Sequence, residues 1–133
     1  LPKHFHKALD NLPEQVLAYA IRGPLFFGAA EKALSVLRRL NPEVKVVIVE
    51  MSAVQMLDMT ALAALESLLH DYQKQGTGLI LVGTSASVRL KLRRAGLHLQ
   101  GNRLAYRGNL QQARAKALQW LNLPAEVASE RAS

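Results

Sequence analysis

The sequence predicts a single α/β domain, and three observations support this class. Short segments rich in Val, Ile and Leu alternate along the chain with longer segments whose apolar residues recur every three or four positions. The chain has 133 residues, the length of one ordinary domain, and half of them are hydrophobic, so a core can form. This alternation favours a largely parallel sheet that helices cover.

Four segments have the length and composition of strands: residues 16–22, 44–50, 79–82 and 104–106. In the first segment, Leu17, Tyr19 and Ile21 alternate onto one face. The second and third segments are almost continuous apolar runs, which are typical of strands buried on both faces. An apolar turn at 25–28 is a candidate for a further, very short strand.

Four segments have the apolar spacing of helices: 29–40, 59–75, one that runs from Ser85 or Ser87 to 95, and one that runs from Asn109 to about 122. Asp58 is the expected N-cap of the second helix, because its carboxylate can accept hydrogen bonds from the unpaired amides of the next turn. Gly76 is expected to close that helix in a left-handed conformation. Asn109 and Gln112 have the spacing of a capping box.

These elements imply boundaries and a core. We expect a flexible linker at 1–13, one domain at 14–123 and a disordered tail at 124–133, after Pro124 has ended the last helix. Nine apolar residues are expected in the core: Ile21, Val47, Val49, Leu62, Leu65, Leu69, Leu81, Leu92 and Leu121.

The sequence lacks the signatures of an enzyme. It has no G-x-S-x-G elbow, no phosphate-binding loop and no dinucleotide fingerprint. It has no cysteine, which excludes thiolate metal sites and cysteine nucleophiles. His4 and His6 form a pair within the expected linker, without further ligands nearby in the sequence. We therefore expect no catalytic residue, no metal and no cofactor.

Positive charge is concentrated in the second half of the chain. The net charge is +7, and no Asp or Glu occurs between Asp71 and Glu126. A surface of one sign attracts nucleic acid, anionic lipid head groups or acidic proteins. Six residues are candidates for such a surface, here called the basic surface: Arg89, Lys91, Arg93, Arg94, Arg103 and Arg107.

A nucleic-acid-binding module is the least favoured of these alternatives. A helix-turn-helix needs a preceding helix joined by a short turn, whereas a strand precedes the basic helix here. We therefore expect a lipid surface or an acidic protein as the partner, and no nucleic acid. The alternative is a solvated face that only keeps the protein soluble.

Three segments resemble a known family. Residues 46–65, VVIVEMSAVQMLDMTALAAL, resemble the core signature of STAS domains, which sulfate transporters and anti-sigma-factor antagonists share. Residues 22–31, RGPLFFGAAE, resemble more narrowly the STAS domains of SulP-type anion permeases. Residues 93–97, RRAGL, are similar to the end of the third helix in that branch. With the order of elements, the resemblance covers roughly residues 14–120.

The resemblance implies a STAS-like fold, with four to five helices and a four- to five-stranded sheet that is mostly parallel but mixed. The strand at 16–22 and the segment around Phe26 are then expected to depart from the parallel arrangement. It also implies a non-catalytic regulatory domain of a SulP-type anion transporter, at the cytoplasmic face of the inner membrane. Its partner would be the transmembrane domain of the same transporter, and dimer formation is a further expectation. The alternative is a free-standing anti-sigma-factor antagonist in a partner-switching pathway.

The resemblance also points to a contact site, made of Asp58, Met59, Thr60, Phe26 and Phe27. Anti-sigma-factor antagonists carry Asp-Ser-Ser-Gly at this helix start, with a hydroxyl that a kinase phosphorylates. Thr60 occupies that position here, but the neighbouring methionine and alanine depart from the pattern. A phosphate, including that of a weakly bound nucleotide, would meet free amides at the helix start, whereas the Asp58 carboxylate would oppose it.

Overall fold

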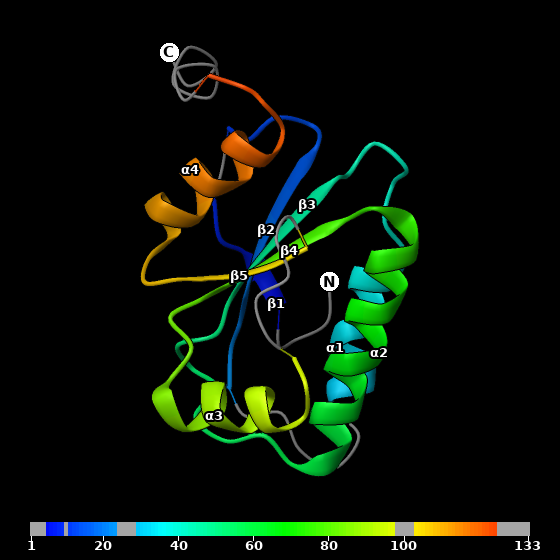
Figure 1. Ribbon diagram of the computed structural model, residues 1–133, viewed down its shortest axis with the longest axis vertical. Coiled ribbons are helices and arrows are strands. Elements are labelled where there is room, and N and C mark those ends of the chain that lie inside the picture. The colour runs from blue at the N-terminus through cyan, green and yellow to red at the C-terminus, as the bar shows by residue number, and fades with distance from the viewer. Residues whose placement is uncertain (1–4, 10, 24–28, 98–102, 125–133) are drawn as a thin grey trace.

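The computed structural model describes residues 5–9, 11–23, 29–97 and 103–124, and they form a five-stranded sheet with four helices (Figure 1). The strands are β1 (Phe5–Lys7), β2 (Val16–Ile21), β3 (Val46–Glu50), β4 (Gly78–Val82) and β5 (Leu104–Arg107). The helices are α1 (Ala29–Arg38), α2 (Met59–Gln75), α3 (Ala86–Arg94) and α4 (Leu110–Trp120). The α/β class and the predicted order of strands and helices from residue 16 onward are confirmed.

The sheet is mixed, with the strands side by side in chain order from β1 to β5. Strands β2 to β5 are parallel, and β1 pairs antiparallel with β2. Two expectations were therefore wrong. The strand at 16–22 is parallel to its neighbour β3, and the antiparallel strand is Phe5–Lys7, within the segment expected to be a flexible linker. Three residues are too few to show a period of two, so only the backbone pairing with β2 defines this strand.

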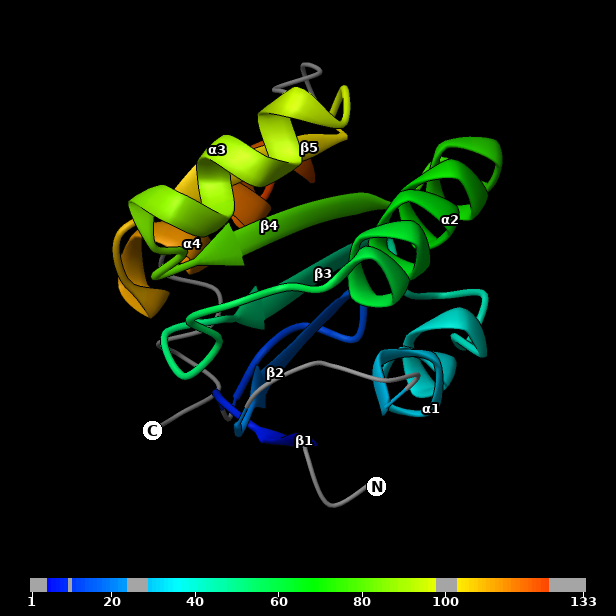
Figure 2. The same ribbon diagram turned by 90° about the horizontal axis from the view of Figure 1, so that it is seen from below.

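Helices cover both faces of the sheet. Helices α1, α2 and α3 lie on one face, and α4 lies on the other (Figures 1 and 2). On the first face, Val47, Val49 and Leu81 of the central strands pack against the apolar stripes of these three helices. On the second face, Ile48 and Ile80 pack with the residues of α4. Burial on both sides explains why β3 and β4 are continuous apolar runs.

The predicted core is largely confirmed. Eight of the nine expected residues are buried, and Leu121 is the exception. It caps the C-terminus of α4 and is only partly buried, while Leu118, one turn earlier, takes the interior position.

Most helix ends follow the predicted capping. Asp58 Oδ1 accepts a hydrogen bond from the Ala61 amide at 2.9 Å, and Gly76 ends α2 with a φ of 74°. Ser85, not Ser87, caps α3. Asn109 caps α4, but the Gln112 side chain accepts from the amide of Gly108 instead of closing the expected box on Asn109.

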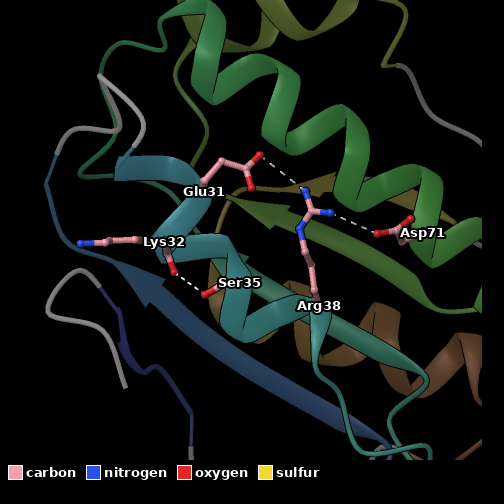
Figure 3. A network of polar contacts seen from close by, with 5 residues as sticks. All are labelled: Glu31, Lys32, Ser35, Arg38 and Asp71. Carbon is pink, nitrogen blue, oxygen red and sulfur yellow. Dashed lines mark hydrogen bonds and ion pairs between the residues drawn. The ribbon is translucent and has the colours of Figure 1, made fainter.

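A polar cluster joins α1 to α2. Arg38 of α1 donates from Nη1 to Asp71 Oδ2 of α2 at 3.2 Å and lies 3.8 Å from Glu31 (Figure 3). Between the same two helices, the buried Tyr72 hydroxyl of α2 donates to the Leu37 carbonyl oxygen of α1. The two helices are therefore held together by polar contacts as well as by apolar packing.

Candidate functional site

The loop between β3 and α2 presents the start of α2 at the surface. Three of its side chains, Met51, Val54 and Leu57, are buried and anchor it to the core. The Met51 amide donates to the carbonyl of Val82 in β4 at 2.7 Å, so the loop begins as an extension of the sheet. These anchors fix the position from which α2 begins.

The three sequence-predicted residues of this helix start lie together. Asp58 is partly buried and acts as the N-cap, whereas Met59 and Thr60 are exposed. A phosphate at this position would be repelled by the Asp58 carboxylate. It would also find the Ala61 amide already donating its hydrogen bond to Asp58. Phe26 and Phe27, the other two members of the expected contact site, lie outside the described residues.

Large apolar side chains are exposed beside this helix start and on α3. Met56 is 65% exposed, Met59 76% and Leu90 of α3 45%. The Lys91 ammonium group of α3 donates to the Leu57 carbonyl and so ties α3 to the loop that carries Met56. We call Met56 and Met59, which lie on either side of the N-cap, the apolar surface. Neither Met56 nor Leu90 was predicted from the sequence, although Leu90 falls off the inward stripe of α3, which is a visible signal of exposure.

The structure divides the expected basic surface. Arg89 of α3 stacks on the Tyr106 ring of β5, with its guanidinium carbon 4.8 Å from the ring centroid. Arg103 and Arg107 flank β5 at its opposite ends. Lys91 donates to the Leu57 carbonyl in the loop before α2 and so lies beside that loop. Arg93 and Arg94, in the last turn of α3, are exposed.

Tyr106 connects the basic residues of α3 with β5. Burial raises the pKa of its hydroxyl, and the positive charges of Arg89 and Arg93 partly offset this rise in pKa. The ring is therefore neutral at ordinary pH and serves as a platform for Arg89. Nothing in the sequence pattern marked Tyr106, because the contact depends on how α3 packs over β5.

Metal binding and membrane crossing find no support in the described residues. No group of three or more His, Asp or Glu side chains is arranged there to hold a metal ion. No helix within the same residues is both long enough and apolar enough to cross a membrane.

Comparisons with known proteins agree on one family. The STAS domain family matches residues 10–106. A solved structure of a sulfate transporter family protein from Wolinella succinogenes is 32% identical, with a TM-score of 0.71, over 84% of this chain and 91% of that one. The STAS domain of a SulP transporter from Vibrio cholerae is 28% identical, with a TM-score of 0.67, over 84% and 87%.

An anti-sigma-factor antagonist shares the fold at lower identity. The Bacillus cell fate determinant SpoIIAA in its phosphorylated form is 15% identical, with a TM-score of 0.62, over 85% of this chain and 98% of that one. A search of curated proteins gave no match. Since the family match spans most of the chain and agrees with the observed sheet and helices, the chain belongs to the STAS domain family.

Proposed function

We propose that this chain is the non-catalytic regulatory domain of a SulP-type anion transporter and that it acts at the cytoplasmic face of the membrane. One observation carries the proposal: the chain is 32% identical to a sulfate transporter family protein over 84% of its length. Identity to the Bacillus antagonist over a similar share of the chain is 15%. This difference in identity supports the transporter branch as our proposal, and both branches have the fold.

The apolar surface supports a role in protein contact. Methionine side chains that are mostly exposed to water are unusual on a monomer, and Met is enriched in protein interfaces. Met56 and Met59 flank the N-cap of α2, which the buried part of the loop holds in place. We assign this surface to contact with the transmembrane domain of the same transporter.

The second candidate is an anti-sigma-factor antagonist, and the exposure of Thr60 favours it. A hydroxyl in the first turn of α2 is open to a kinase. Against this, Met59 and Ala61 occupy the positions beside it, and Ala61 is buried. If the antagonist function holds, Thr60→Ala should abolish release of a partner on phosphorylation. The transporter function predicts that Thr60→Ala has no effect on transport.

A transport assay on the full-length protein tests the apolar surface. Met56→Glu with Met59→Glu should lower uptake of labelled sulfate several-fold, because two carboxylates cannot be buried at an apolar contact without a large penalty. Gln111→Glu, an exposed position on α4, is the matched control and should leave uptake unchanged. Equal uptake by both variants, at equal abundance in the membrane, would rule out this contact.

A further inference from the structure

The helices that follow β4 and β5 cover opposite faces of the sheet. The chain leaves β4 into α3 on one face of the sheet, and it leaves β5 into α4 on the other face (Figure 1). Because the loops after these two neighbouring strands lead to opposite faces, they leave a crevice beyond the carboxyl ends of the strands, the end at which ligands bind in open α/β sheets. A cavity of about 140 Å³ lies at this place, lined by Gly83, Thr84, Arg89, Tyr106, Arg107 and Gly108.

Two guanidinium groups line the cavity, and Tyr106 positions both. Arg107 donates from Nη1 to the Tyr106 carbonyl oxygen at 2.6 Å, and Arg89 stacks on the Tyr106 ring. A guanidinium carries five N–H donors in a rigid fork, so the contact to the carbonyl leaves Arg107 with further donors. Paired arginines of this kind suit an oxyanion, which can accept two parallel hydrogen bonds from each fork.

Thr84 provides a second, independent observation. Its hydroxyl oxygen is closed off from solvent and has no hydrogen-bond partner within the described part of the chain. An unpaired buried hydroxyl is unfavourable, and native structures seldom keep one without a reason. The hydroxyl is turned away from the cavity, so the side chain must rotate about χ1 before it can donate to an oxyanion bound there.

The local field also favours an anion. Thr84 and Gly108 lie just before the N-caps of α3 and α4, where the positive ends of both helices are directed. The Glu50 carboxylate opposes an anion, because its Oε1 would be 3.1 Å from a Cβ atom on Gly83, a residue of the cavity wall. The amide and the hydroxyl of Ser52 both donate to that oxygen, and Glu50 does not line the cavity.

We propose that this crevice binds a small tetrahedral oxyanion, phosphate or sulfate, through Arg89, Arg107 and the Thr84 hydroxyl. Pockets for drug-sized ligands measure roughly 300–1,000 Å³, so the cavity has room for an oxyanion but not for a whole nucleotide. The inference does not depend on the proposed transporter function. It is also separate from the start of α2, which is the nucleotide contact that the sequence suggests.

Titration of the 133-residue chain, followed by NMR of its backbone amides, tests the site. Sodium phosphate and sodium sulfate, each added at constant ionic strength, should cause saturable shifts at Gly83, Thr84 and Gly108. Sodium chloride is the control for general screening of charge. Phenyl phosphate distinguishes a free ion from the terminal phosphate of a larger molecule: tighter binding than phosphate would assign the site to a phosphomonoester, and weaker binding to the free ion.

Substitutions connect the shifts to these side chains. Arg89→Gln and Arg107→Gln should each weaken binding by about tenfold or more, as expected when a hydrogen bond to a charged group is lost. Thr84→Val keeps the shape of the side chain and should weaken binding several-fold while the amide spectrum stays that of a folded protein. Arg94→Gln, on the same helix but away from the cavity, is the matched control and should leave binding unchanged.

Four outcomes would overturn the site. Three of them are the absence of saturable shifts with phosphate and sulfate, equal shifts with chloride, and binding that the Arg89, Arg107 and Thr84 variants leave intact. Equal weakening by Arg94→Gln would likewise show that only the net charge matters.

Discussion

Asp58 is the residue whose role follows most directly from the sequence. It occupies the position before an amphipathic segment, and the structure confirms its hydrogen bond to the Ala61 amide. A cap could be predicted because it needs only residues three apart in the chain. Lys91 shows the opposite case, since its hydrogen bond to the Leu57 carbonyl joins residues 34 apart and depends on the packing of α3.

Replacing Asp58 tests the cap. Asp58→Ala should lower the free energy of unfolding by about 1 kcal/mol, because an amide in the first turn of α2 loses its partner. Asp58→Asn should be nearly neutral, since asparagine caps about as well as aspartate does. Denaturant unfolding of the three proteins measures both effects. Equal losses in both variants would show that the charge, and not the cap, stabilises α2.

At the scale of elements, the pairing of α1 with α2 was only partly predictable. The apolar stripes of both helices are visible as three- and four-residue spacing, and the residues expected inside are buried. The polar cluster around Arg38 was not visible, because its partner Asp71 lies 33 residues away (Figure 3). The strand Phe5–Lys7 was missed for the same reason, since its partner in β2 defines it.

Because of Tyr72, the free energy of unfolding should depend on pH in the alkaline range. Burial raises the pKa of its hydroxyl well above the ordinary 10.0, and the charge of Arg38 only partly offsets this. Above pH 10 the unfolded chain loses this proton while the folded chain keeps it, so stability present below pH 10 is lost as the pH rises. The free energy of unfolding should then fall by up to about 1.4 kcal/mol for each pH unit.

Tyr72→Phe should remove this slope. The variant loses the hydrogen bond to the Leu37 carbonyl and should be less stable at neutral pH, but its stability should fall less between pH 10 and 11. Urea unfolding of both proteins across this range measures the difference in slope. Parallel curves would mean that Tyr72 does not control the alkaline transition.

At the scale of the whole molecule, charge and apolar exposure are unevenly distributed. The sequence predicted that the second half of the chain is basic. It did not predict that Arg89 and Arg107 would line the crevice beside Tyr106 while other arginines lie exposed at the end of α3. That division depends on which face each helix covers, which the charge pattern does not reveal. The order of elements was predictable because β3 is a continuous apolar run and the apolar residues of α2 recur every three or four positions.

Anionic lipid head groups are the expected neighbours of the exposed end of α3. Each basic residue near such a surface contributes roughly 1 kcal/mol to binding. The double variant Arg93→Glu, Arg94→Glu should therefore lose co-sedimentation with vesicles that contain anionic lipid, and neither protein should bind neutral vesicles.

Arg114→Glu with Lys116→Glu is the matched control for charge. It makes the same change on α4, on the other face of the sheet, and should keep most of the vesicle binding. Equal loss in both double variants would indicate attraction by net charge alone. Negligible binding by the unchanged protein would remove lipid as the partner and leave an acidic protein.

The central claim is that this STAS domain is part of an anion transporter, and the native coding sequence tests it most directly. Sequencing the reading frame upstream of Leu1 should show roughly ten or more apolar segments of about 20 residues each, the length that a membrane-spanning helix needs. A frame that begins close to Leu1 and encodes no such segment would contradict the account. It would favour a free-standing antagonist instead.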